Sequence, residues 1–445
     1  MDQSNHKSFR ARFLRLARDY GMLGVLILLC LLFSVLTIDE QHPTGEAAAS
    51  LVAGRLPTSG IITIVAAESS DDSAFIRRLS ELAGTSSRVR TVQGDPATVR
   101  AALSASLDTS GVIVSTEGYA PVVKAILAQL PSFKTIEVIV PPAYRWPTFL
   151  LANNIRNVAN QIAVIALVAI GMTLVIITAG IDLSVGSLIA LSAVFCAWVI
   201  GHMGGENASG LGMLFAALVA ITLCGATGAF SGLMITRFGI PPFIATLAMM
   251  QVAAGVAYII SAGKPIYQIP QSFTALGRGV DPLLHIPYAV ILMVALYLIA
   301  HVVMSRTVLG RYIYAVGGNP EAARLAGIRV KVVLFSVYSI CGLLAGLGGV
   351  VLASQLKSGA PTYGLTYELY VIAAVVVGGT SLSGGEGKVF GTLIGAFVIA
   401  VIQNGMNLTN VETYTQKVVL GLVILGAVLL DRIKQQGMAW KRKRV

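Results

Sequence analysis

Ten apolar runs separated by polar segments dominate the hydropathy pattern of this chain. A helix needs about 20 residues to cross a bilayer, and most of the runs approach this length, the last few being shorter. They lie near residues 21–38, 158–179, 183–203, 211–235, 240–262, 286–304, 331–355, 365–379, 389–406 and 416–430. The pattern predicts an all-α polytopic membrane protein with about ten transmembrane helices.

Residues 39–147, between the first and second runs, have a different pattern. Short apolar segments alternate with helical ones, which is typical of a parallel α/β sheet. Asp95-Pro96 reads as the cap and first turn of a helix. We expect strands at 60–68, 88–94, 111–118 and 133–142, and helices at 70–83, 96–107 and 119–130. The segment is predicted to be a small α/β domain, with linkers at 39–57 and 142–148.

Composition supports a membrane protein. The chain is 55% hydrophobic and 12% charged, whereas soluble domains contain about 25% charged residues. The four cysteines lie in apolar runs, which predicts neither disulfides nor a metal site. No cofactor is expected. The run at 21–38 lacks an A-x-A cleavage pattern, so we interpret it as an uncleaved first span rather than a signal peptide.

The distribution of charge predicts the orientation. The net charge of the chain is +11, and basic residues cluster in three segments. Residues 1–38 have five basic and two acidic side chains, residues 305–331 have five and one, and residues 431–445 have six and one. Positive loops face the cytoplasm, so both termini are expected inside and 39–147 in the periplasm. Nucleic-acid binding is a poor interpretation, because the cations lie at membrane edges.

These patterns divide the chain into four parts. We expect a cytoplasmic N-terminus with the first span at 1–38, a periplasmic insert at 39–147, a transmembrane core at 148–430 and a basic cytoplasmic tail at 431–445.

The segment Gly180-Ile-Asp-Leu-Ser-Val-Gly-Ser187 places a carboxylate between two apolar runs. A charge at a helix centre costs about 2.5–3.5 kcal/mol on insertion scales. Glycines on both sides allow a helix break where the backbone lines protein or water. We therefore consider two roles for Asp182, a structural hydrogen-bond knot and a gating group.

The loop at 305–331 is too long for a tight connection. Asn319-Pro320 predicts a helix start, and Gly327 a helix end. One interpretation is a solvated cytoplasmic loop, and the other is a helix that docks into a partner.

Two short segments imitate nucleotide-binding motifs. Leu382-Ser-Gly-Gly-Glu386 resembles the signature sequence of ABC ATPases, and Gly387-Lys388 resembles the end of a P-loop. A P-loop needs a glycine five residues before that final glycine and Ser or Thr after the lysine, where this chain has Leu382 and Val389. We interpret both segments as a glycine-rich turn, so this chain is expected to hydrolyse nothing itself.

Three motifs together carry a specific resemblance. The chain resembles the membrane permease subunits of bacterial ABC sugar importers, of the ribose and xylose type, over span 1 and roughly 148–430. The motifs occur in the family's order, and the stretch from Thr148 to Val158 also matches. They are Gly180–Ser187, Gly310–Ile328 and Gly378–Phe397.

The resemblance implies an inner-membrane importer subunit that works with several partners. These are a cytoplasmic ABC ATPase subunit, a periplasmic solute-binding protein, a second copy of this chain and the surrounding membrane lipid. The ATPase-facing loop would be 306–328. Its expected coupling residues are Gly310, Arg311, Asn319, Pro320, Glu321, Arg324 and Gly327.

Polar and aromatic side chains in or beside the spans are candidates for the translocation path. The expected gating or pathway residues are Gly180, Asp182, Ser184, Gly186, Gln251, Glu368 and Asn404, with Gln403, Asn407, Phe243, Tyr258, Tyr363, Tyr367 and Tyr370 as further candidates. For the aromatic residues, helix packing or interfacial anchoring is the competing interpretation.

The insert departs from the family, which has a short loop there. Its order of elements resembles half a lobe of a sugar-binding protein, so it could bind ligand, dock the binding protein or be passive. The fold of the insert does not by itself decide among these three roles.

Three other functions remain open beside a monosaccharide importer. They are import of a nucleoside or other small polar solute by the same architecture, ion-coupled secondary transport, and membrane sensing through the insert. The docking-like loop and the scarcity of acids within spans argue against ion coupling. A sensor would need an output domain, and only about 15 residues follow the last span.

Overall fold

A computed structural model of the chain describes residues 21–57, 60–83, 87–105, 111–130 and 136–442. The basic residues before position 21, the last three residues of the tail and the start of the strand predicted at 133–142 lie outside these ranges. The chain forms two compact units, Ile38–Thr148 on the one hand and Met1–Thr37 with Phe149–Val445 on the other.

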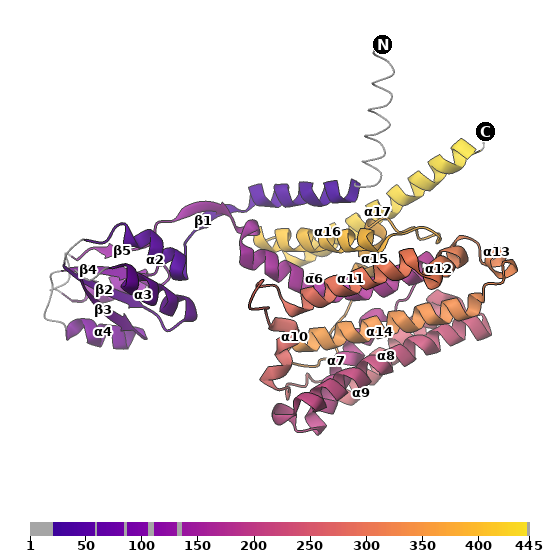
Figure 1. The fold of residues 1–445 in the computed structure, drawn as a ribbon, viewed down its shortest axis with the longest axis horizontal. Coiled ribbons are helices and arrows are strands. Elements are labelled where there is room, and N and C mark those ends of the chain that lie inside the picture. Colours follow the sequence, from indigo (N-terminus) through magenta and orange to yellow (C-terminus); the bar gives the residue numbers. More distant parts are fainter. Residues whose placement is uncertain (1–20, 58–59, 84–86, 106–110, 131–135, 443–445) are drawn as a thin grey trace, which may run out of the picture. The chain divides into compact units, whose positions relative to one another are not determined.

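The smaller unit is built on a parallel sheet (Figure 1). Its strands are β2 (Gly60–Ala66), β3 (Ser87–Gln93), β4 (Gly111–Ser115) and β5 (Val138–Ile139), in the order β3-β2-β4-β5. Its helices are α2 (Gly45–Ala53), α3 (Ser70–Leu82), α4 (Pro96–Ser104) and α5 (Ala120–Ala128). The predicted alternation of strands and helices is confirmed.

Helices cover both faces of this sheet, which explains why its central strands β2 and β4 are largely apolar. On one face, Ile62 and Ile64 of β2 pack with α2 and α3, and on the other, Val65 packs with α4 and α5. Asp95 caps α4 by accepting a hydrogen bond from the Thr98 N–H at 2.7 Å. Hydrogen bonds from the Thr98 side chain and then from its backbone N–H lower the pKa of the Asp95 carboxyl, because they stabilise the ionised form.

The prediction of linkers at 39–57 and 142–148 was wrong. Strand β1 (Ile38–Gln41) pairs antiparallel with β6 (Tyr144–Pro147), and α2 packs onto the sheet. The strand predicted at 133–142 is shorter than expected, since β5 covers only two residues and is followed by prolines, which have no N–H to donate to a sheet.

The larger unit is a helical bundle (Figure 1). Within the part of the chain that the structure describes, seven helices are long and apolar enough to cross a membrane. They are α6 (Ala152–Ile177), α7 (Val185–His202), α8 (Gly210–Phe238), α9 (Pro242–Ser261), α11 (Tyr288–Arg306), α14 (Val330–Leu356) and α16 (Val389–Leu408). Three shorter apolar helices are Gly21–Leu36, α15 (Tyr367–Val377) and Thr413–Leu429 within α17 (Thr413–Arg442). The chain is thus polytopic and helical, and its helices fall on the ten apolar runs.

Helix α6 lies at the centre of the bundle. It contacts α11, α14, α15 and α16, and 89% of its most apolar window is buried, against 22% for α9 and for α11. Helices that expose this much apolar surface are suited to face lipid. The sequence pattern could not rank the helices in this way, because all of them are similarly apolar.

Small residues allow a close contact between α8 and α14. Gly228 of α8 and Gly342 of α14 face each other, and a methyl group on either would strike the backbone of the other helix. Small residues at such crossings let membrane helices approach closely.

Candidate functional site

The loop predicted at 305–331 is mostly helical. Helix α12 (Val308–Gly318) follows α11 directly, and α13 (Pro320–Leu325) comes before α14. Gly310 permits the bend between α11 and α12, because a methyl group there would strike the backbone of Val303 and Met304. Arg311 is exposed on α12. Helix α12 was not predicted from the sequence.

Asn319 shapes the turn between α12 and α13. Its Oδ1 accepts hydrogen bonds from the backbone N–H groups of Glu321 and Ala322, each at 3.0 Å. Pro320 occupies the first helical position, where an N–H would have no partner within the helix. Gly327 follows the helix with a φ of 83°. The local structure predicted for this helix from its cap, proline and glycine is therefore present.

The outward surface of α13 is exposed and chemically mixed. Glu321 and Arg324 form an ion pair at 2.9 Å, in which both side chains are at least 70% exposed. Leu325 is 86% exposed. An exposed ion pair contributes about 0–1 kcal/mol to stability, so these three side chains can be replaced with little loss of folding.

The other side of α13 packs near α14 and is hydrogen-bonded to the short connection that leads into it. Ala323 is buried, and its carbonyl accepts a hydrogen bond from the Ile328 N–H at 3.0 Å. Helix α13 lies at one end of the larger unit, and α10 (Ala275–Arg278) lies at the other (Figure 1). A displacement of α13 would thus act directly on the start of α14.

Two of the three sequence motifs, Gly310–Ile328 and Gly378–Phe397, meet at the end of α6, just before the third motif begins at Gly180. Gly317 of α12 lies against the carbonyl of Ile177, the last residue of α6, so closely that no side chain would fit. The same carbonyl accepts a hydrogen bond from Gly385 N–H at 2.8 Å. The Tyr314 hydroxyl donates to the Gly387 carbonyl at 2.7 Å. Segments far apart in the sequence are therefore directly linked.

The segment that resembles an ATPase signature is part of this junction. It lies in the turn between α15 and α16, where Gly384 and Gly385 both have positive φ, 81° and 76°. The interpretation of 382–388 as a glycine-rich turn agrees with the structure.

A break between α6 and α7 holds Asp182. Its Oδ1 accepts two hydrogen bonds from Ser184, from the backbone N–H at 2.9 Å and from the hydroxyl at 2.6 Å. Both residues are fully buried. Apart from the neighbouring Cys341 thiol, Asp182 Oδ2 has no polar partner among the residues that the structure describes. The hydrogen-bond knot predicted as one of two roles is present.

Two other helices hold this break in place. Thr246 of α9 contacts it, because its hydroxyl accepts from the Leu183 N–H at 3.2 Å, while the carbonyls of Pro242 and Ile181, at 2.9 and 3.2 Å, share its single proton. Tyr338 of α14 covers Gly180, where a methyl group would strike the phenol oxygen. Thr246, Tyr338 and Cys341 could not be predicted from the sequence, since each lies inside an apolar run. Helix α14, which begins at the exposed α13, thus reaches the Asp182 knot.

Glu368 lies between two helix starts. It belongs to the first turn of α15, and its carboxylate touches Gly186 in the first turn of α7. Helix N-termini favour negative charge, and Gly186 allows the approach because it has no side chain. The Glu368 side chain is half-buried, so it remains accessible. Gly186 and Glu368 are thus a second pair of pathway candidates in contact, beside Asp182 and Ser184.

Three tyrosines predicted for the path lie near the start of α15. Tyr367 and Tyr370 form an edge-to-face pair with ring centroids 6.3 Å apart. The Tyr363 hydroxyl shares a hydrogen bond with Ser358. Two of these aromatic residues, Tyr367 and Tyr370, lie in α15 together with Glu368.

The remaining candidates have separate environments. Asn404 of α16 and Asn154 of α6 exchange two amide hydrogen bonds, at 3.0 and 2.9 Å, which favours helix packing as the role of Asn404. Asn407 accepts a bond from Gln416. Gln251 is exposed on α9 without a side-chain hydrogen bond to any described residue. Gln403 is half-buried, and Phe243 and Tyr258 are exposed on α9.

Comparisons with known proteins identify the larger unit. The family model described as the branched-chain amino acid transport system / permease component matches residues 154–428. The ribose import permease protein of Escherichia coli K12 is 44% identical over 291 residues, which cover 65% of this chain and 88% of the relative. The corresponding ribose permease of Bacillus subtilis is 45% identical over 290 residues, 65% of this chain and 87% of the relative.

Relatives named for other sugars are also similar. The L-arabinose transport system permease protein of Escherichia coli K12 is 37% identical over 290 residues, covering 65% of this chain and 86% of the relative. No solved structure matches the chain.

Proposed function

The chain belongs to the family of permease components of branched-chain amino acid transport systems, and from this premise we propose that it imports a monosaccharide across the bacterial inner membrane. It is the permease subunit of an ABC importer and does not itself hydrolyse ATP. The observation that carries the sugar assignment is 44% identity across 88% of a ribose permease. Relatives named for allose and arabinose support the same substrate class.

The proposed assembly contains two copies of this chain, a cytoplasmic ATPase and a periplasmic binding protein. All ten apolar helices cross the membrane, with both termini inside and 38–148 outside. This orientation follows from the basic clusters at 305–331 and 431–445. Under it, α13 faces the ATPase, and the start of α6 lies on the periplasmic side.

The coupling mechanism that we propose starts at α13. ATP binding closes the ATPase dimer and displaces the docked helix. The contact between Ala323 and Ile328 transmits this displacement to α14, whose Tyr338 and Cys341 border the Asp182 knot. Such coupling requires that ATP and the loaded binding protein favour different states of the permease.

Replacing Leu325 tests the docking surface. Leu325→Ser removes the most exposed apolar group of α13, and we expect at least tenfold less ATPase subunit to copurify from host membranes. The matched control is Leu283→Ser, since Leu283 is 83% exposed in the loop before α11. Glu321→Ala with Arg324→Ala should act like Leu325→Ser without lowering the melting temperature.

Vesicle transport tests the rest of the proposal. Uptake of D-ribose, D-allose or L-arabinose should require ATP, the ATPase and the binding protein. Uptake by the chain alone without ATP would instead establish a secondary carrier. Copurification unaffected by the α13 variants would refute the docking surface.

A further inference from the structure

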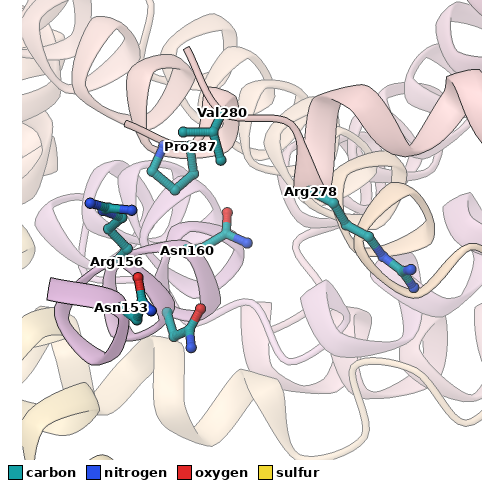
Figure 2. Close-up of a pocket in the computed structure, with 7 residues that line it drawn as sticks. Asn153, Arg156, Asn160, Arg278, Val280 and Pro287 are labelled. Atoms are coloured by element: carbon teal, nitrogen blue, oxygen red, sulfur yellow. The ribbon is translucent and has the colours of Figure 1, made fainter. Parts of the chain in front are cut away.

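A pocket of about 390 Å³ opens beside the first turns of α6 (Figure 2). This volume lies within the range of small-molecule sites, roughly 300–1,000 Å³. No lining residue is acidic. Its lining residues are Asn153, Arg156, Asn157, Asn160, Arg278, Val280 and Pro287.

Four of these side chains form one polar stripe on α6. Positions 153, 156, 157 and 160 are spaced i, i+3, i+4 and i+7, which places them on one helix face. The stripe ends abruptly, because every residue from Ile162 to Ile177 is buried. Three carboxamides and a guanidinium at the end of the central helix are a concentration of hydrogen-bonding groups found nowhere else along α6.

Two polar lining residues, Asn160 and Arg278, are held in place by hydrogen bonds, whereas the other polar lining side chains have no such bonds to described residues. Asn160 Nδ2 donates to the Gly277 carbonyl at 2.9 Å, and Arg278 Nε is held by the Gln355 carbonyl. In Figure 2 the Arg278 guanidinium points away from the α6 stripe. The side chains of Asn153, Arg156 and Asn157, by contrast, make no hydrogen bond or ion pair with any residue that the structure describes.

The opposite side of the pocket is apolar. Val280 and Pro287 pair as an isolated β-bridge, which Tyr288 N–H reinforces by donating to the Gly279 carbonyl at 3.0 Å. Figure 2 shows Pro287 and Val280 facing the α6 stripe. Amide and guanidinium groups thus face a small hydrocarbon surface.

This chemistry suits a neutral polyhydroxylated ligand. Carboxamides both donate and accept, as hydroxyl groups do, and the C–H face of a sugar ring can pack on Val280 and Pro287. We propose that the pocket binds the transported monosaccharide on the periplasmic side, after its release from the binding protein and before it crosses. The proposal rests on the proposed function, which supplies the substrate class and the orientation.

The test uses the full-length chain in phosphatidylcholine nanodiscs. D-ribose, D-allose and L-arabinose are titrated separately and followed by saturation-transfer NMR, without ATPase or binding protein. We expect saturable binding of at least one sugar. Arg156→Gln and Asn157→Ala should each raise its dissociation constant at least tenfold. Matched controls are Arg237→Gln and Asn207→Ala, which change exposed residues outside the pocket and should bind as the unmodified chain does.

Parallel transport assays with the complete complex distinguish a failure of the pocket assignment from a failure of the proposed importer function. If the complete complex imports a sugar but the chain alone binds none, or if the pocket variants bind like the controls, the pocket assignment is overturned and the importer stands. Binding of inorganic phosphate in place of sugar would also overturn it, because the pocket would then be an oxyanion site. If no sugar is imported or bound, both proposals fail.

Discussion

At the scale of single residues, Asp182 uses one carboxylate oxygen for both of its bonds to Ser184. An amide oxygen at the same place could accept the same two bonds. The structural part of its role therefore depends on an acceptor rather than on a charge.

Two substitutions separate acceptor from charge. Asp182→Asn should insert and fold normally, whereas Asp182→Ala leaves the Ser184 N–H unpaired in a buried place and should lower the free energy of unfolding by about 1–3 kcal/mol. Thermal unfolding in detergent measures the difference. A loss of transport by Asp182→Asn, with the ATPase still bound, would assign the charge to gating. Equal stability of the two variants would refute the structural role.

The contact between Gly186 and Glu368 gives a second prediction. A methyl group in Gly186→Ala would strike the Glu368 carboxylate and the Gly364 carbonyl, so we expect about 1–3 kcal/mol of destabilisation from overpacking, together with reduced transport. Gly255→Ala is the matched control, since nothing lies within 4 Å of the added group. It should be neutral or stabilising. Similar melting temperatures for both variants would contradict the close approach.

The sequence predicted these residues but not their partners. Asp182, Gly186 and Glu368 stand out because a charge or a glycine interrupts an apolar run. Thr246 and Tyr338 do not, because a hydroxyl within an apolar helix is ordinary and only the tertiary fold shows what it binds. Asn404 stands out in the same way, as a polar side chain in a span, and its amide partner Asn154 could not be predicted from the sequence.

At the scale of elements, α12, α13 and α14 form the connection from the exposed tip to the membrane core. Helix α13 was predictable, because its cap, first-turn proline and closing glycine are adjacent in the sequence. Helix α12 was not, since its glycines lower helix propensity and its position depends on contacts with α6 and α11.

The cap of α13 can be tested by itself. Asn319→Ala removes the acceptor for two backbone N–H groups and should destabilise α13 by about 1 kcal/mol. Because α13 has only six residues, we expect faster amide hydrogen exchange at positions 321–325 and weaker ATPase binding, with the melting temperature of the bundle unchanged. Asn319→Asp, which retains a capping oxygen, should restore slow exchange. Unchanged exchange in Asn319→Ala would show that ion pairing or packing, not the cap, holds the helix.

At the scale of the whole molecule, the comparisons and the fold divide the chain at nearly the same place, between the smaller unit and the permease bundle. The family model begins at residue 154, and the smaller unit ends at Thr148. The sequence predicted an α/β insert from its change of pattern. It could not predict the β1–β6 pairing, because these strands lie about 105 positions apart and each reads locally as a linker. This pairing brings the two ends of the insert together, with Gln41 opposite Tyr144.

That register shows how the smaller unit can be removed. Replacing residues 42–143 with Asn-Gly should close β1 and β6 into a hairpin, because a two-residue type I′ turn suits antiparallel strands. We expect this shortened chain to insert, to bind the ATPase and to keep ATP-driven uptake.

The smaller unit can also be tested by itself. Residues 38–148, expressed without the rest of the chain, should unfold cooperatively. Phe75→Ala, which empties a fully buried position, should lower their stability by about 3–5 kcal/mol.

Uptake kinetics then decide what the insert contributes. A passive domain predicts the same half-saturating sugar concentration with and without residues 42–143. A domain that raises the local substrate concentration predicts a higher value without it, at an unchanged maximal rate, because tethering alters effective concentration and not the transport step. Loss of ATPase binding in the shortened chain would contradict both, since the insert would then be needed to form the permease itself. The pairing of β1 with β6 makes this experiment possible, because it lets a domain of about 100 residues be exchanged for one turn while the ends of the flanking segments stay paired.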